Sequence, residues 1–239
     1  MAAPGGGWRA GAAAGLGGML IGGAAVAGFY GLRGPDRAAT EAIVRDYVLN
    51  HGEILPEAME RAQRRQASAS VAQHRAALER PYRSAWAGAA DGDVVLVEFF
   101  DYACPYCRVT NGDVDRLLAE DSRLKVVWRE LPVLGPNSEA AARVSLAAAR
   151  QGRFRQFHQR MFALGRPTDA VVAQAVAEVG VAREGETADG RAELARNLEL
   201  ARAVGATGTP TFVIGGQVLQ GAVGYEALKA AIAAARASR

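Results

Sequence analysis

The sequence predicts a mixed α/β protein with helical segments before its sheet. Three observations lead to this fold class. Residues 93–100, DVVLVEFF, form an apolar, β-branched run with the length of a buried central strand. Residues 211–219 have the pattern of a strand, a Gly-Gly turn and a second strand. Between these two regions, residues 138–204 carry helical patterns, and half of the 239 residues are hydrophobic, enough for a sizeable core.

The chain begins with an apolar leader, residues 1–34. Residues 10–32 contain no charged side chain and are long enough to span a bilayer. The triplet Ala25-Val26-Ala27 also supplies the small residues of a signal-peptide cleavage site. The leader is therefore expected to be a cleaved signal or a membrane anchor, and both export the rest of the chain.

Residues 35–81 are expected to form a helical segment that is too small for a core of its own. Two apolar stretches mark its helices, with a stop at Asn50-His51-Gly52 between them. They consist of Ile43, Val44, Tyr47 and Val48, and of Ile54, Leu55, Ala58 and Met59. Such a segment must dock on the rest of the chain or assemble with copies of itself, and we expect a homo-oligomer.

The chain has two cysteines, Cys104 and Cys107, in C-x-x-C spacing. Two cysteines cannot make a four-thiolate zinc site, and the three histidines lie far apart in the sequence, so no metal site is expected. A disulfide across two intervening residues closes a tiny loop and gains little loop entropy. The spacing therefore favours a redox pair, in a compartment where thiols can be oxidised.

The cysteine pair lies at a predicted junction between strand and helix. The strand at 93–100 ends just before Cys104, and Pro105 suits the first turn of a helix. Helix N-terminal N–H groups and the helix dipole stabilise a thiolate, so Cys104 is expected to attack and Cys107 to resolve. The apolar stripe predicted for this helix is Val109, Val114, Leu117 and Leu118.

Glu98 interrupts the apolar strand. A carboxylate is costly to bury unless it is hydrated, paired or protonated, and burial would raise its pKa. Two interpretations follow. Glu98 is either a solvated residue that faces an edge or a buried acid that relays protons to Cys107.

A second motif follows about a hundred residues after the cysteines. The Gly/Thr-rich loop that ends at Thr209 precedes Pro210, which heads the predicted strand at 211–214. A proline in this position suits a tight turn, and the Thr209–Pro210 bond is predicted to be cis.

Together, VLVEFFDYACPYC, GTPTFVIGG and a closing helix from Tyr225 onward resemble the DsbA-like branch of the thioredoxin superfamily over residues 82–239. This resemblance implies a thioredoxin fold with a helical insertion at about 138–204. It also implies that Cys104 and Cys107 are the attacking and resolving cysteines and that Glu98 is the buried acid. Thr209 and Pro210 then form the cis-proline dipeptide that binds the substrate.

Two residues of the motif, Pro105 and Tyr106, lie between the cysteines. The strongest oxidases of this branch carry histidine at the position of Tyr106, so the resemblance implies a less extreme oxidant here. Thr209, in place of an aliphatic residue before Pro210, resembles the isomerase-leaning members of the branch at this position. His158, within the implied insertion, is expected to be a packed or solvated histidine without a catalytic role.

The pattern IVRDYVLNHGEILPEAME resembles the N-terminal oligomerisation segment of suppressor-of-copper-sensitivity C (ScsC) proteins. The combined resemblance implies an exported thiol-disulfide oxidoreductase, in the periplasm or at the extracytoplasmic face of the inner membrane. It would form or isomerise disulfides in client proteins that contain cysteines, be recharged by an unidentified redox partner and need no cofactor.

Two other functions remain open. The thiol pair could instead hold Cu(I), a soft ion that prefers thiolate ligands, which would make the chain a copper-handling protein. A stable scaffold with an inactive cysteine pair is the third hypothesis. Binding to nucleic acid is not expected, because the net charge of +3 is not concentrated in one stretch of the chain.

Overall fold

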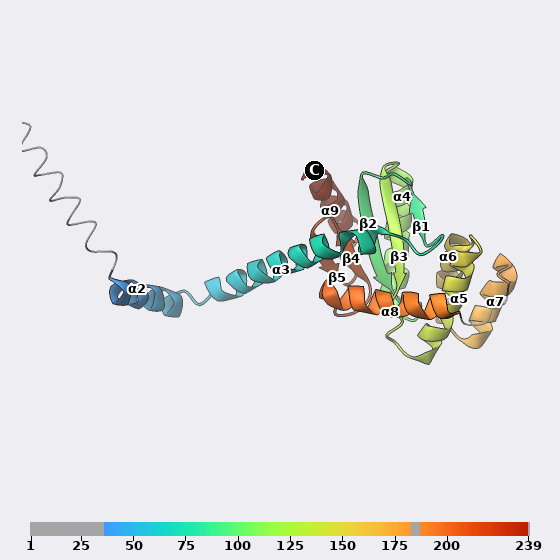
Figure 1. The fold of residues 1–239 in the computed structure, drawn as a ribbon, viewed down its shortest axis with the longest axis horizontal. Coiled ribbons are helices and arrows are strands. Elements are labelled where there is room, and N and C mark those ends of the chain that lie inside the picture. Colours follow the sequence, from blue (N-terminus) through green and yellow to red (C-terminus); the bar gives the residue numbers. More distant parts are fainter. Residues whose placement is uncertain (1–35, 183–186, 239) are drawn as a thin grey trace, which may run out of the picture. The chain divides into compact units, whose positions relative to one another are not determined.

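The computed structural model describes residues 36–182 and 187–238 (Figure 1). The chain divides into two compact units, Met1–Met59 and Glu60–Arg239. The predicted signal or anchor, residues 1–34, lies outside the described residues. None of the helices that the structure describes is long and apolar enough to cross a membrane.

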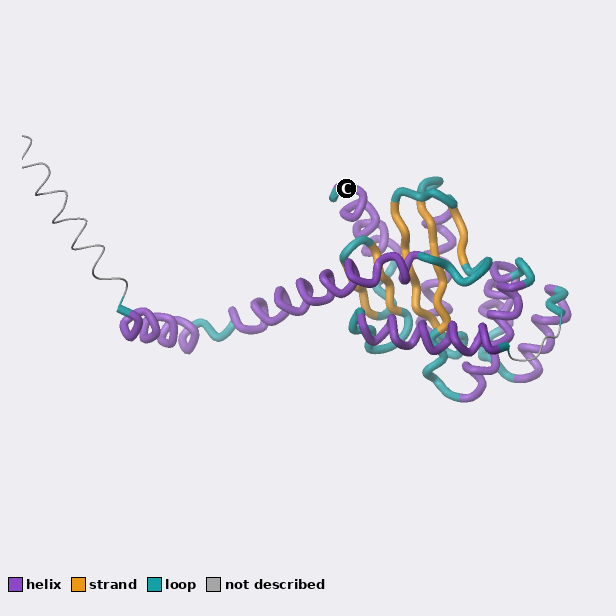
Figure 2. Tube along the Cα trace, viewed as in Figure 1, coloured by secondary structure: helices purple, strands orange, loops and turns teal. Residues whose placement is uncertain are grey.

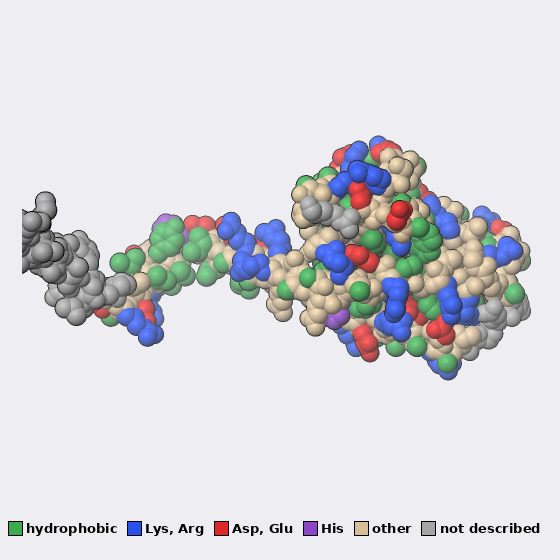
Figure 3. Space-filling view, turned by 45° about the horizontal axis from the view of Figure 1, so that its top comes forward, with side chains coloured by type: hydrophobic (Ala, Val, Ile, Leu, Met, Phe, Trp, Pro, Cys, Tyr) green, Lys and Arg blue, Asp and Glu red, His purple; other side chains and the backbone are tan. Residues whose placement is uncertain are grey.

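The described part of the first unit consists of α2 (Arg37–Asn50) and the start of α3 (Ile54–Glu79). Helix α2 begins after Asp36, whose side chain accepts a hydrogen bond from the backbone N–H of Ala38, as expected of an N-cap. No residue of α2 is buried. The predicted apolar stripe is instead exposed, and Figure 3 shows hydrophobic side chains along this segment. Its most exposed members are Ile43 (70%), Val44 (55%) and Tyr47 (53%).

The second unit contains a five-stranded mixed sheet in the order β1-β3-β2-β4-β5. Its strands are β1 (Trp86–Gly88), β2 (Val94–Phe100), β3 (Leu124–Glu130), β4 (Thr211–Ile214) and β5 (Gln217–Gln220). Strand β2 is central, as the sequence predicted, and pairs parallel to β3 and antiparallel to β4. The predicted hairpin is confirmed as β4 and β5, which pair antiparallel across Gly215 and Gly216.

Helices cover both faces of this sheet (Figure 2). They are α4 (Pro105–Glu120), α5 (Pro136–Arg150), α6 (Phe154–Leu164), α7 (Asp169–Val179), α8 (Ala188–Ala203) and α9 (Tyr225–Ala237). The helical patterns between β3 and β4 and the closing helix from Tyr225 are thus confirmed as helices. Helices α4, α6 and α9 contribute to the core on one face, and α8 with the second half of α3 contributes to the core on the other.

The period of two along each strand divides the core between the two faces. Leu96, Phe100 and Trp128 point to the face that α4 covers, whereas Val97 and Val127 point to the face of α8. The buried residues of α3 join this second cluster, and they are Val71 and Leu78. In the stripe predicted for α4, Val114 and Leu117 are buried, but Val109 is 68% exposed, so the prediction for Val109 is wrong. Cys107 and Thr110, on either side of it, are buried, so Val109 points away from the face of α4 that packs on the sheet.

Arg129 on β3 connects the sheet to the end of α3 through hydrogen bonds. This side chain is only 2% exposed, and its guanidinium donates to the backbone carbonyl oxygens of Leu78 (3.1 and 3.0 Å) and Arg80 (2.7 Å). It also donates to Glu193 (3.1 Å) and Asn197 (2.8 Å) on α8. A buried charge is tolerated only when it is paired and hydrogen-bonded, as it is here. The second half of α3 is therefore an integral part of the second unit.

Candidate active site

The two cysteines lie at the start of α4. Cys104 is the N-cap residue, and Pro105 opens the first turn, as predicted. The backbone N–H of Cys104 donates to the carbonyl oxygen of Asp101 (3.0 Å), which closes the turn between β2 and α4. Both thiols are free, with Cys104 3% exposed and Cys107 0% exposed. Cys104 thus lies where the free N–H groups of the helix can stabilise a thiolate.

The loop before β4 meets Cys104. The Thr209–Pro210 peptide bond is cis, as predicted. The carbonyl oxygen of Thr209 lies 3.2 Å from Sγ of Cys104, at hydrogen-bond distance from the thiol. The structure thus brings the C-x-x-C pair and the loop that contains Pro210 together in one site.

Cys107 has a different environment, one turn inside α4. Burial raises the pKa of the Cys107 thiol, and the nearby charge of Glu98 raises it further. A hydrogen bond from the backbone N–H of Asp101 acts in the opposite direction but is the weaker effect. Cys107 therefore stays protonated at neutral pH, and it must lose a proton to act as a nucleophile.

Glu98 is a buried acid with 2% exposure, so the interpretation as a solvated residue is wrong. It lies on central strand β2 and points to the face of the sheet that α4 covers, because its period-two neighbours Leu96 and Phe100 point there. Burial raises its pKa from 4.5 to about 8, although a hydrogen bond from Trp128 opposes this shift. A group with a pKa near neutrality can both give and take a proton under ordinary conditions.

Asp101 has a supporting role that the sequence analysis missed. Its buried carboxylate accepts hydrogen bonds from the backbone N–H groups of Ala103 (2.8 Å), Val133 (2.9 Å) and Leu134 (3.0 Å). The first bond holds the turn before Cys104, and the other two hold the loop after β3. A single carboxylate thus connects the cysteine turn to a loop that begins 32 residues further along the chain.

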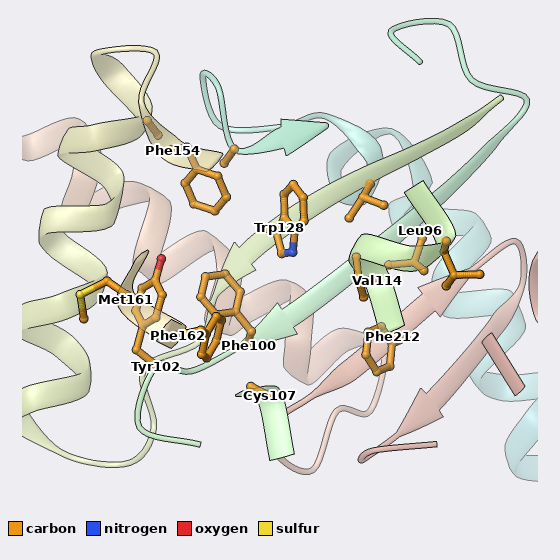
Figure 4. Close-up of a cluster of buried hydrophobic side chains, with 14 of the residues drawn as sticks. Leu96, Phe100, Tyr102, Cys107, Val114, Trp128, Phe154, Met161, Phe162 and Phe212 are labelled. Atoms are coloured by element: carbon orange, nitrogen blue, oxygen red, sulfur yellow. The ribbon is translucent and has the colours of Figure 1, made fainter. Parts of the chain in front are cut away.

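His158 on α6 is buried and packs against the rings of Phe100, Trp128 and Phe154, which are labelled in Figure 4. Its ring centroid lies 4.7 Å from that of Phe100 and 5.1 Å from that of Trp128. Its ring nitrogens are within hydrogen-bond distance of Tyr102 (3.3 Å) and Asn111 (3.1 Å). Burial lowers its pKa to about 3, so the ring is neutral at physiological pH. The prediction of a packed histidine is confirmed.

Four large apolar side chains are exposed on the elements that carry the site. They are Tyr106 (63%), Val109 (68%), Val133 (49%) and Leu134 (50%). The first two belong to α4 and the other two to the loop that Asp101 holds. Within the described residues, no three His, Cys, Asp or Glu side chains lie close enough together to bind a metal ion.

The chain belongs to the family of DSBA-like thioredoxin domains, whose model matches residues 95–233. A second family model, that of the copper resistance protein ScsC N-terminal domain, matches residues 36–69. Both resemblances found in the sequence are therefore confirmed.

Two solved structures show the same relationship. A linker-deletion mutant of ScsC from Proteus mirabilis is 30% identical, with a TM-score of 0.74, and the match covers 87% of this chain and all of that one (100%). A periplasmic thioredoxin-like protein from Salmonella enterica serovar Typhimurium is 30% identical, with a TM-score of 0.65, over 68% of this chain and 95% of that one.

A curated relative, Na(+)/H(+) antiporter NhaA 3 from Salinispora tropica, is 33% identical over 166 residues, which is 66% of this chain and 26% of that protein. A second one, from Salinispora arenicola, is 32% identical over 65% of this chain and 25% of its own length. The chain thus spans about a quarter of the length of the curated relatives it matches.

Proposed function

We propose that the protein is an exported thiol-disulfide oxidoreductase that forms or isomerises disulfides in client proteins. One observation carries the proposal. The thiol of Cys104 lies at the start of a helix, 3.2 Å from the carbonyl oxygen of Thr209, with Cys107 one turn further along the same helix. A nucleophile, a resolving thiol and a backbone segment that can hold an extended chain are therefore adjacent.

The chemistry is an exchange of disulfide bonds. The Cys104 thiolate attacks one sulfur of a client disulfide, forms a mixed disulfide and releases the other client sulfur as a thiolate. Cys107 then loses its proton and attacks the Cys104 sulfur, which forms the Cys104–Cys107 disulfide and releases the client with its second thiol. In the reverse direction, a client thiolate attacks the oxidised pair, and Cys107 leaves and takes up a proton. Electrons thus pass between client and protein in pairs.

Glu98 is the proposed proton relay for Cys107. The resolving thiol needs a base, because its pKa is raised by burial. The Glu98 carboxyl lies close enough for its charge to raise that pKa. With its own pKa of about 8, about a tenth of Glu98 is ionised at neutral pH and can accept a proton, and this fraction grows as the pH rises. It returns that proton when Cys107 is the leaving group.

Clients are proposed to bind as an extended segment beside Thr209. The backbone of Thr209 can pair with such a segment as in strand addition, which places the client sulfur near Cys104. The exposed side chains of Tyr106, Val133 and Leu134 offer apolar contacts around the same site. Because backbone hydrogen bonds do not depend on the identity of the client side chains, this arrangement suits clients of varied sequence.

Assembly and location are further parts of the proposal. No residue of α2 is buried, so its apolar stripe stays exposed in the described part of the chain, and the match to the ScsC N-terminal domain covers this stripe. We therefore propose a homo-oligomer that is joined through these residues. The structural relative from Salmonella enterica is periplasmic, which supports a place in the periplasm or at the outer face of the inner membrane, with residues 10–32 as a signal or anchor.

The test uses the chain without residues 1–34. We expect it to turn over many equivalents of a reduced or scrambled disulfide protein. Cys104→Ser abolishes turnover, whereas Cys107→Ser accumulates client mixed disulfides that a reducing agent releases. The reduction potential of the unmodified Cys104–Cys107 pair then separates a preference for oxidation from one for isomerisation. Stoichiometric binding of Cu(I) with no turnover would contradict the proposal and favour the copper-handling alternative.

A further inference from the structure

Trp128 is the direct neighbour of Glu98 across the sheet. In the parallel pairing of β2 with β3, Glu98 stands opposite Trp128, and both side chains are 2% exposed. The indole Nε1–H of Trp128 donates to Oε2 of Glu98 over 3.0 Å. Within the described residues, this is the one hydrogen bond that the Glu98 side chain makes. Figure 4 shows Trp128 beside Phe154 and Phe100, in the buried cluster that also contains Cys107.

Helix α6 holds the indole ring in place. The ring centroid of Trp128 lies 5.7 Å from that of Phe154 and 5.1 Å from that of His158. The guanidinium carbon of Arg155 lies 5.2 Å above the ring, within the range of a cation–π contact. All three residues belong to α6, so the orientation of the indole donor depends on where this helix sits.

An ion pair connects this arrangement to the helix of the cysteines. The guanidinium of Arg155 lies 2.7 Å from a carboxylate oxygen of Asp115 on α4, and both side chains are about one-third exposed (29% and 33%). The charge of Asp115 acts on Glu98 in the sense that disfavours ionisation. Arg155 therefore both covers the indole ring and balances the negative charge of Asp115, which disfavours ionisation of Glu98.

Several groups that can carry charge face Glu98. Cys107 and Asp115 face it from α4, and Tyr102 faces it from the loop after β2. His158 and Arg155 lie beyond Trp128 on α6, and His158 is neutral because burial lowers its pKa. None of these groups donates a hydrogen bond to the Glu98 carboxyl. Trp128 alone stabilises the ionised form directly, since an indole N–H is a donor only.

We propose that Trp128 is a positioning residue that orients the Glu98 carboxyl for proton exchange with Cys107, and that Arg155 fixes Trp128 for this task. The proposal rests on the proposed role of Glu98 as the proton relay. It assigns a function to the contact between α6 and the sheet, because displacement of α6 would move the donor that Glu98 needs in order to accept a proton.

The experiment follows the resolving step as a function of pH. Reduced protein is mixed rapidly with a quenched fluorescent disulfide peptide, and release of the second peptide reports the attack by Cys107. Trp128→Phe keeps a buried aromatic ring but removes the donor. Loss of a hydrogen bond to a charged group costs about 1.5–3 kcal/mol, which corresponds to a rise of about 1–2 pH units in the midpoint of the rate profile.

Two further variants complete the design. Arg155→Gln leaves Asp115 unbalanced and the ring uncovered, so we expect its midpoint to rise as well, and its partly exposed position should preserve folding. Trp86→Phe is the matched control, because Trp86 packs in the cluster on the other face of the sheet and contacts Lys125 rather than Glu98. Its midpoint should equal that of the unmodified chain.

The outcomes separate this inference from the proposed function. Upward shifts in Trp128→Phe and Arg155→Gln, together with loss of the pH step in Glu98→Gln, support it. If the pH dependence of the rate is lost in Glu98→Gln but its midpoint is unchanged in Trp128→Phe and Arg155→Gln, the role of Trp128 is overturned and Glu98 remains the relay. If the pH dependence of the rate persists in Glu98→Gln, the proposed relay itself is contradicted. Titration of the Glu98 carboxyl by carbon NMR gives the same midpoint without any turnover.

Discussion

The carbonyl oxygen of Thr209 lies 3.2 Å from the sulfur of Cys104, although 105 residues separate them in the chain. This proximity defines where a client must lie if its sulfur is to reach Cys104. In the proposed mode of binding, the client backbone adds to the segment before β4, with the exposed apolar side chains of the α4 start nearby.

We expect client peptides to depend on a backbone N–H beside their cysteine. N-methylation at the residue next to the cysteine removes a hydrogen bond to the Thr209 backbone, which is worth about 1 kcal/mol, so the second-order rate of mixed disulfide formation should fall about fivefold. A peptide methylated several residues away is the control. Equal rates for the two peptides would show that the Thr209 backbone does not hold the client.

The two cysteines should differ in reactivity toward an alkylating reagent. Burial raises the pKa of Cys107, whereas Cys104 lies at a helix N-terminus. At neutral pH, the Cys107→Ser variant, which keeps Cys104, should therefore react at least about tenfold faster than Cys104→Ser, because each pKa unit changes the thiolate fraction tenfold. A faster reaction of Cys107 would reverse the assigned roles.

Glu98 should make the folded protein less stable as the pH rises. The folded chain keeps a proton on Glu98 up to about pH 8, while the unfolded chain releases it near its ordinary pKa of 4.5. The unfolded state binds fewer protons between these values, so the free energy of unfolding falls across this window. At about 1.4 kcal/mol per unit, the loss is at most about 5 kcal/mol.

Denaturant unfolding of the reduced protein over this pH range provides the measurement. We expect the stability of Glu98→Gln relative to the unmodified chain to increase steadily with pH up to about pH 8. Glu120→Gln is the control, because hydrogen bonds that Glu120 accepts from Tyr225 and Arg116 lower its pKa, so its effect on stability is confined to acid pH. A constant difference between Glu98→Gln and the unmodified chain would mean that Glu98 does not hold a proton.

The exposed stripe of α2 leads to a prediction about assembly. The double substitution Val44→Asp and Tyr47→Asp places two charges in the middle of the stripe. The chain without residues 1–34 should therefore change from an oligomer to a monomer in analytical ultracentrifugation. Oxidation of dithiol peptides should be unchanged. Rescue of scrambled disulfides should fall several-fold, because the proposed oligomer favours it by placing several Cys104 sites around one client. Ala42→Asp is the control, since a period of 3.6 places Ala42 on the opposite side of the helix.

Point substitutions are preferable to a deletion of residues 36–80 for this test. Removing residues 36–80 would also remove Val71 and Leu78 from the core and the carbonyl groups that Arg129 binds. A monomer produced by such a deletion would therefore confound assembly with stability. If the unmodified chain is already monomeric at micromolar concentration, a monomeric oxidase replaces the oligomer model.

The local signals in this sequence were sufficient for most elements of the fold. Strand β2, the β4–β5 hairpin, the start of α4 at Pro105 and helix α6 follow from short-range properties, namely a period of two or 3.6, turn residues and the preference of proline for a first turn. The C-x-x-C spacing also indicated redox chemistry without any structure. These properties depend on neighbours within about one turn or one strand, so the sequence contains them directly.

Tertiary structure alone decided how the site is supported. Strand β3 was not predicted, and its register against β2 places Trp128 opposite Glu98 and Arg129 under the end of α3. Register in a parallel pair is set by the packing of both faces and not by a local turn, so no short pattern encodes it. The same reason applies to Asp101, because two of its three partners, Val133 and Leu134, lie in a distant loop. The sequence by itself therefore identified the candidate reactive groups. The folded chain determined their burial and hydrogen bonds, because both depend on neighbours brought together from remote segments.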